Sequence, residues 1–294
     1  MAKYRLIVDS SCDLPVDFYT KYNIGVTDLV VNFNERQYLD RKDITSKEII
    51  DKYKETGIFP KTSALNIPEL ESMMSDALKD YDHLFYLPIS SYISSINNNA
   101  HLAMSTLNVS DKVTVLDSLS LSGGTALEAI GISEDINKGL SVEEIIQNHE
   151  ERAKKISMSF VIQTMEFLHK GGRCSGLTYL LGNKFSIHPI VRLENGKMVV
   201  HSLVRGKDLS KGIAKMLDEF KKEFESDNID FSYPIMIPHV TGEYGVNKIE
   251  HELKELVGEN MLLPIDASGI ITCHCGENTV GLGYMLKKPL LNSK

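Results

Sequence analysis

One pattern in the N-terminal half restricts the fold most strongly: a short apolar run that ends in serine or aspartate. The runs are YRLIVDSS (4–11), HLFYLPIS (83–90) and KVTVLDS (112–118). Between the first two, apolar side chains at helical spacing share one face: Leu70, Met73, Met74, Ala77 and Leu78. Strands that alternate with helices predict a mostly parallel sheet covered by helices. Ligands on such sheets collect at the carboxyl ends of the strands, where these polar residues stand.

Two helix starts are marked by a hydroxyl residue followed three positions later by glutamate. TSKE (45–48) has the spacing of a capping box and predicts a helix over 47–55. SVEE (141–144) predicts a helix that runs to about residue 155, and SMSFVIQT then starts a new strand. We therefore expect an N-terminal α/β domain over residues 1–156 and a C-terminal α+β domain over residues 157–294.

The second half predicts a mixed sheet with helices on one face. HPIVRLENGKMVVHSLV (188–204) is typical of a hairpin, because Asn195-Gly196 supplies the positive φ values of a tight turn. Amphipathic helices are expected near residues 209–224 and 244–257, with YPIMIPHV as a strand between them. The expected fold class is thus α/β, with a mostly parallel sheet flanked by helices and a mixed α+β domain.

Composition and charge exclude several classes of protein. The formal net charge of −8 and the absence of a Lys/Arg-rich block argue against nucleic-acid binding. The start MAKYRLIVDSSCDLP has too short an apolar run for a signal peptide, and no later segment approaches a transmembrane span. Four cysteines in 294 residues do not form a disulfide scaffold. We expect a cytoplasmic protein without an integral membrane segment.

The stretch GIITCHCGENTVGLG (269–283) concentrates cysteine, histidine and glycine, and we tested it against known chemistries. If it is a strand, Cys273 and Cys275 point to one face and His274 to the other, and zinc sites usually have Cys-x-x-Cys spacing; we expect no metal. The spacing of Gly276 and Gly281 matches a phosphate-binding loop, but the required lysine is missing. Two interpretations stay open: a glycine-rich turn that presents His274, or a cysteine nucleophile with His274 as its base.

Further donors suited to an anion occur in other short segments. HKGGRCSG (169–176) presents Arg173 from a glycine turn, and Arg205 leaves a strand just before a helix. Both arginines suit carboxylate or phosphate oxygens, although a surface ion pair is the alternative for each. KTSAL (61–65) and SSYISS (90–95) add hydroxyl donors. Helix capping is the alternative there, with Ser63 or Asn66 as the cap.

Seven segments, in chain order, resemble motifs of the DegV family. They are DSSCDLP (9–15), TS (62–63), ISSYIS (89–94), VLDS (115–118), FLHKGGR (167–173), VRGK (204–207) and HCG (274–276). The resemblance implies two α/β domains with a cleft between them that holds one long-chain fatty acid such as palmitate. Some members are the fatty-acid-binding subunit of a bacterial fatty acid kinase, in which a separate ATP-binding kinase subunit phosphorylates the carboxylate to an acyl phosphate. The chain itself is then a lipid carrier, without enzymatic activity or cofactor.

The resemblance also implies roles for individual residues. Thr62 and Ser94 match the hydroxyls that hold the carboxylate, and Ser63 lies beside them. Arg205 and His274 match the arginine and histidine near the head group, and Arg173 joins them as a donor. The expected ligand-binding set is Thr62, Ser63, Ser94, Arg173, Arg205 and His274. A carboxylate in an apolar cleft needs such donors to offset its desolvation, and a phosphate would favour Arg205 and a protonated His274.

The sequence departs from the family pattern at the site. The usual SGT is Ser94-Ser95-Ile96, the usual proline is Leu65, and the usual THTGPG is CHCGEN (273–278). Glu277 places a negative charge near an expected anion, so either the ligand differs or Glu277 points to solvent. Two rival functions remain: a thiol-dependent acyl transferase or hydrolase that uses Cys273 or Cys275 with His274, and a ligand sensor without a kinase partner. A candidate acyl lining is Leu180, Leu181, Phe185 and Ile187, although an apolar stripe is more often plain core.

Overall fold

Four parallel strands form the sheet that the N-terminal apolar runs predict. The structure, a computed structural model, describes residues 2–173 and 187–290. The strands of this sheet, in spatial order, are β2 (Ile24–Thr27), β1 (Tyr4–Asp9), β6 (His83–Leu87) and β7 (Val113–Val115). Every neighbouring pair is parallel, which confirms the three expected strands. The sequence prediction missed β2, because four residues are too few to show a clear period.

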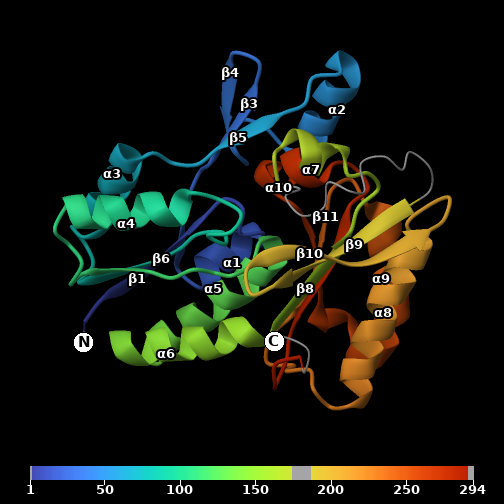
Figure 1. The fold of residues 1–294 in the computed structure, drawn as a ribbon. Helices are drawn as coiled ribbons and strands as arrows, with labels where there is room; N and C mark the ends of the chain where they lie inside the picture. The colour runs from blue at the N-terminus through green and yellow to red at the C-terminus, as the bar shows by residue number, and fades with distance from the viewer. Residues whose placement is uncertain (1, 174–186, 291–294) are drawn as a thin grey trace.

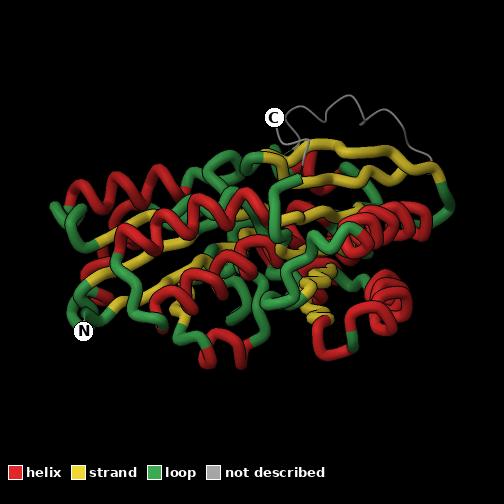
Figure 2. Tube along the Cα trace, turned by 90° about the horizontal axis from the view of Figure 1, so that it is seen from below, coloured by secondary structure: helices red, strands yellow, loops and turns green. Residues whose placement is uncertain are grey.

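Helices cover both faces of the parallel sheet, as Figures 1 and 2 show. The helices of the N-terminal half are α1 (Val16–Lys21), α2 (Ser46–Thr56), α3 (Ile67–Ala77), α4 (Ile96–Thr106), α5 (Ser122–Asn137) and α6 (Val142–Arg152), followed by the short 3-10 helix η1 (Ala153–Lys155). Both expected helix starts are confirmed, and capping boxes begin α2 and α6. A third capping box, with Asn66 as the cap, begins α3. Ser63 is therefore not the cap of that helix.

A small antiparallel sheet, which the sequence analysis did not predict, stands beside α2 (Figure 1). Its strands, in order, are β4 (Arg36–Leu39), β3 (Val30–Phe33) and β5 (Lys61–Ser63). The central pairing joins segments far apart in sequence, with Val31 opposite Thr62. Strands of three or four residues carry too little pattern to be recognised from sequence. Strand β5 forms because it pairs with the distant strand β3. Its consequence is that Thr62 is held on an ordered strand.

The second half forms the expected mixed sheet. Its strands, in spatial order, are β10 (Lys197–Arg205), β9 (Ile187–Glu194), β8 (Ile156–Val161), β13 (Val280–Met285), β11 (Ile235–His239) and β12 (Leu262–Asp266). Within the described part of this sheet, β11 and β12 pair in parallel and the other neighbouring pairs are antiparallel. The hairpin turn is confirmed, with φ of 48° at Asn195 and 81° at Gly196. The helices α8 (Ser210–Glu225) and α9 (Glu243–Val257) are confirmed as well, and a short 3-10 turn, η3 (Glu259–Met261), precedes β12.

Helix α5 joins the two halves, because it packs against strands of both large sheets. Gly123 and Gly124 on α5 permit this close approach: a Cβ at Gly123 would lie 2.8 Å from Cβ of Met236, on β11. One buried cluster accordingly includes Leu6 and Val8 from β1 together with Met236. The two halves share a core at this helix, and the boundary near residue 156 stays a prediction.

The stretch that was expected to be a strand or a glycine turn begins with a helix. Residues Gly269–Cys275 form α10, which corrects the strand geometry assumed in the sequence analysis. The Ser268 side chain caps it by accepting the N–H of Ile271 at 3.3 Å. The helix ends at Gly276, whose φ is 75° and whose added Cβ would lie 2.6 Å from the Phe167 ring. A second short helix, α7 (Glu166–Lys170), packs against α10.

Two buried carboxylates of the N-terminal half hold the first turn of α10. Asp13 accepts the N–H of Ser268 at 2.9 Å, and Asp40 accepts the N–H of Gly269 at 2.7 Å. Both aspartates have no exposed surface. Arg41 pairs with Asp13, and Ser10 donates its hydroxyl to Asp40 at 2.7 Å. The first motif of the sequence, which ends β1 in polar residues, thus serves to anchor α10.

Asp40→Ala removes one of these acceptors and leaves the N–H of Gly269 and the Ser10 hydroxyl without their partner. We expect the free energy of unfolding to fall by about 1–3 kcal/mol, the usual cost of an unpaired buried polar group. Urea unfolding followed by circular dichroism measures this. Asp51→Ala is the control, because Asp51 is exposed and pairs with Lys47 on the surface; a loss of similar size in both variants would contradict the anchoring role.

Candidate ligand-binding site

Five of the six predicted ligand-binding residues line one pocket. Thr62 and Ser63 come from β5, Ser94 from the loop between β6 and α4, Arg173 from the turn after α7, and His274 from α10. The pocket has an empty volume of about 560 Å³, which includes its open mouth. Its remaining lining among the described residues is apolar apart from the Cys275 thiol. The pocket therefore combines polar groups from both halves of the chain with apolar walls.

A hydrogen bond joins the central pair of this pocket. Thr62 Oγ1 lies 2.9 Å from His274 Nε2. The other ring nitrogen, Nδ1, is buried and has no partner among the described residues. A Cβ built on Gly171 would overlap this nitrogen, so the C-terminal end of α7 needs a glycine to accommodate the His274 ring. Strand β5 and helix α7 together fix the orientation of the ring.

Without a bound phosphate, burial keeps His274 neutral at pH 7. Desolvation of the ring, together with the nearby charge of Arg173, lowers the pKa of His274 to about 3. A protonated His274 is expected only beside a phosphate, and that stays a prediction. A neutral ring still offers one donor and one acceptor to a ligand.

Arg173 is the permanently charged side chain among the described residues that line the pocket. Its Nη1 donates to the carbonyl of Gly171 at 2.8 Å, and its Nε donates to the carbonyl of Ile93 at 3.3 Å. The preceding Gly172 has a φ of 72°, which allows the chain to turn back toward the pocket. Two backbone contacts thus hold the guanidinium in place, and its remaining N–H groups have no partner among the described residues.

The two serines differ in exposure. Ser63 is exposed and its hydroxyl accepts a hydrogen bond from Asn32 at 2.9 Å. Ser94 is half-buried, and its hydroxyl accepts the N–H of Ile96 at 3.3 Å, which leaves its own proton to donate. Each hydroxyl can therefore donate to an oxygen in the pocket.

Arg205 is not brought to this pocket. It is exposed at the end of β10, and it is absent from the described lining. The sequence prediction grouped it with the other donors because its position before a helix matched the family motif. The hairpin places it elsewhere, since β10 is an edge strand of the second sheet.

Comparison with known proteins decides the family. A protein-family model described as "Uncharacterised protein, DegV family" matches residues 3–287. The chain belongs to the DegV family. It is 29% identical to a "Fatty acid-binding protein" of Thermotoga maritima, over 96% of this chain and 97% of that protein. The solved structure titled "Fatty Acid Binding of a DegV family Protein from Thermus thermophilus" is similar with a TM-score of 0.87 and 27% identity, over 97% of this chain and 100% of the other.

A third DegV structure agrees with this fold. It is titled as a DegV lipid-binding protein of Thermotoga maritima, and it has a TM-score of 0.81 and 27% identity over 98% of this chain and 100% of the other. In the described part of this DegV chain, no helix is long and apolar enough to cross a membrane. The same residues contain no group of three or more His, Cys, Asp or Glu side chains that could hold a metal ion.

Glu277, the residue that disagrees with the usual DegV motif, is neutralised outside the pocket. Its carboxylate pairs with Lys54 of α2, and it is not among the described lining residues. The question raised by this departure has a structural answer: the side chain faces α2. The positive charge of Lys54 therefore offsets the repulsion that Glu277 would exert on an anion in the pocket.

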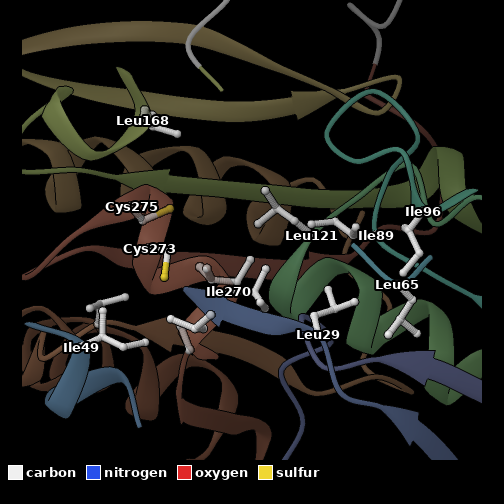
Figure 3. Close-up of a cluster of buried hydrophobic side chains, with 14 of the residues drawn as sticks. Leu29, Ile49, Leu65, Ile89, Ile96, Leu121, Leu168, Ile270, Cys273 and Cys275 are labelled. Carbon is white, nitrogen blue, oxygen red and sulfur yellow. The ribbon is translucent and has the colours of Figure 1, made fainter. Parts of the chain in front are cut away.

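The two cysteines of α10 lie in different environments, and Figure 3 shows them projecting from different sides of the helix. Both belong to one buried apolar cluster, and Cys275 also lines the pocket whereas Cys273 does not. Burial raises the pKa of Cys275 to about 12 and also raises that of Cys273 well above its ordinary value. His274 is bonded to Thr62. A thiolate nucleophile is disfavoured here, since both thiols stay protonated at neutral pH.

A second, smaller cavity adjoins the pocket and was missed by the sequence analysis. Its empty volume is about 260 Å³, and it shares Leu121, Ile271 and Cys275 with the pocket. A helix prediction for α10 could have indicated part of this wall, because Ile271 and Cys275 are four residues apart. The proposed acyl-lining residues Leu180, Leu181 and Phe185 lie outside the described residues, as does Cys174. Ile187 lies on β9 and lines neither cavity.

The lowered pKa of His274 predicts a specific loss of stability in acid. The unfolded state, with an ordinary histidine pKa near 6.5, binds the proton first, so stability is lost as the pH falls below that value. Between pH 7.5 and 5.5 this residue should cost about 1.4 kcal/mol. Urea unfolding of the delipidated proteins at both pH values measures the loss in the free energy of unfolding. We expect this loss to be about 1.4 kcal/mol smaller in His274→Gln than in wild type. An equal loss in both proteins would contradict the neutral, desolvated ring.

Proposed function

We propose that this DegV protein binds one long-chain fatty acid, with the carboxylate at Thr62, Ser94, Arg173 and His274 and the acyl chain in the apolar cavities. The observation that carries this proposal is the junction of polar and apolar space. Hydroxyl, guanidinium and imidazole groups gather at one pocket, and three of its other lining residues, Leu121, Ile271 and Cys275, also line the second cavity. Relatives whose titles name fatty-acid binding support the same ligand class.

The electrostatics of the pocket suit a carboxylate. Removing this anion from water is costly unless several donors replace its hydration. Arg173 supplies the charge, and its contacts with two backbone carbonyls leave further N–H groups without a partner among the described residues. Thr62, Ser94 and the neutral His274 add donors without adding a second charge. No described lining residue carries a negative charge, and Glu277, which lies outside the lining, is paired with Lys54.

We further propose that the bound carboxylate is presented to a separate ATP-dependent kinase subunit, which phosphorylates it to an acyl phosphate. The polar residues lie on β5, a surface loop and the turn after α7, so a partner can reach the head group from the open mouth. The protonated cysteines support a carrier rather than an acyl transferase. The resemblance of the sequence motifs to the fatty-acid-binding kinase subunit supports the same role.

Lipid extraction tests the ligand class directly. We expect protein purified from bacteria without detergent to release about one fatty acid per chain on denaturation, because a tightly held ligand survives purification. Mass spectrometry of the extract measures its amount and identity. Protein that is empty and also fails to take up added palmitate would overturn the proposal.

The two arginines provide a matched pair of variants. Arg173→Gln removes the charge at the pocket, and we expect the affinity for palmitate to fall about 10- to 100-fold, the usual value of a charge-assisted hydrogen bond. Arg205→Gln removes an equal charge outside the described lining and should leave the affinity unchanged. Displacement of a fluorescent fatty acid measures both. Equal losses in the two variants would contradict the placement of the head group.

A coupled assay tests the kinase step separately. We expect the palmitate-loaded protein, mixed with a cognate kinase subunit and ATP, to yield an acyl phosphate that hydroxylamine traps as a hydroxamate. Cys273→Ala and Cys275→Ala should support the same yield, because the reaction uses no thiol. A protein that binds palmitate but gives no product with a kinase subunit active on its own carrier would favour a ligand sensor.

A further inference from the structure

The pocket and the second cavity are neighbours that have three lining residues in common. Leu121, Ile271 and Cys275 line both spaces, and we call these three residues the constriction. Beyond them, most of the lining of the second cavity is apolar, including Met158, Phe160 and Val240. The hydroxyls there are already bonded: Ser122 donates to Asp13, and Thr279 donates to the carbonyl of Cys275 at 3.0 Å. His239 also lines this cavity, and its Nδ1 accepts the N–H of Gly242 at 3.3 Å. Because the polar side chains of the lining have partners, this cavity suits hydrocarbon rather than a polar group.

One wall of the constriction is held in a strained backbone conformation. Leu119 and Ser122 flank Leu121 and have φ values of 47° and 52°, in the left-handed region that side chains rarely adopt. Such conformations persist where surrounding contacts over-determine them. The N–H of Leu119 donates to Asp117 at 3.0 Å, and the carbonyl of Ser120 accepts the N–H of Ser90, also at 3.0 Å. Leu121 is thus fixed from both sides.

The other wall of the constriction is tied to the first by a single carboxylate, that of Asp13. Ile271 and Cys275 are one turn apart on α10, so they face the same side of the helix. Asp13 accepts the N–H of Ser268, which begins α10, and also the hydroxyl of Ser122, which follows Leu121. One buried side chain therefore ties both walls, and the spacing between them cannot change without breaking its hydrogen bonds.

We propose that Leu121, Ile271 and Cys275 form a constriction of fixed width that selects fatty acids by the length and thickness of the acyl chain. This inference rests on the proposed function of the pocket. A short chain ends on the mouth side of the constriction, whereas a long straight chain passes through it into the second cavity. A chain with a methyl branch at that depth is too thick to pass. Leu121 and Cys275 are then residues that determine specificity.

Narrowing the constriction tests the proposal. Cys275→Leu adds volume between the two cavities, and we expect the affinity for palmitate to fall at least about tenfold while the affinity for octanoate changes by less than about threefold. Cys273→Leu is the matched control, because it adds the same volume to the same helix at a buried position that lines neither cavity. Its ratio of palmitate to octanoate affinity should equal that of wild type.

Widening the constriction gives a second test that needs no added volume in a packed site. We expect Leu121→Ala to bind a mid-chain methyl-branched fatty acid at least about tenfold more tightly, relative to palmitate, than wild type does. Displacement titrations measure all of these affinities, with circular dichroism to confirm folding. If Cys275→Leu weakens both chains equally or leaves palmitate unchanged, or if Leu121→Ala keeps the wild-type preference, the constriction does not select. Wild-type protein that binds neither fatty acid would instead overturn the proposed function itself.

Discussion

The structure depends on two buried carboxylates that hold a helix from the other end of the chain. Asp13 and Asp40 accept the first N–H groups of α10, more than two hundred residues away in sequence. These N–H groups have no partner within the helix and carry part of the positive end of its dipole. A carboxylate is the complementary group, and burial strengthens the interaction because water cannot screen it.

This arrangement also balances a cost. Burial raises the pKa of Asp40 to about 6 and raises the pKa of Asp13 above its ordinary value, which shows how strongly the interior disfavours a charged oxygen. Arg41 offsets that cost by pairing with Asp13 and by donating to the carbonyl of Ser10 at 3.1 Å. Arg41 itself has a φ of 64°, in the left-handed region, and its guanidinium points inward to Asp13. The acid and base groups around β1 therefore serve the fold, while the pocket lies farther along α10.

Sequence reasoning predicted the features that depend on local pattern. The three strand endings, the capping boxes of α2 and α6 and the Asn195-Gly196 turn follow from residues within a few positions of each other. The features it missed depend on distant partners. Helix α10 is only seven residues long and its first N–H groups are held by Asp13 and Asp40 of the other half. Strand β5 forms because β3 lies beside it. The position of Arg205 outside the described pocket lining has the same cause. Its motif was recognised in the sequence, but tertiary packing sets the direction of the edge hairpin that carries it.

The same burial that shapes the apolar cavities also decides what chemistry the pocket can perform. Placing α10 against a dry interior keeps the Cys273 and Cys275 thiols protonated and keeps His274 neutral. A nucleophile needs the opposite, a thiolate stabilised by a nearby cation or a base able to take a proton near pH 7. Arg173 provides a guanidinium held by two backbone carbonyls. Among the described lining residues, the Arg173 guanidinium can retain an anion, and the protonated Cys275 thiol and the neutral His274 ring are poorly suited to nucleophilic attack. This combination supports the proposed carrier role.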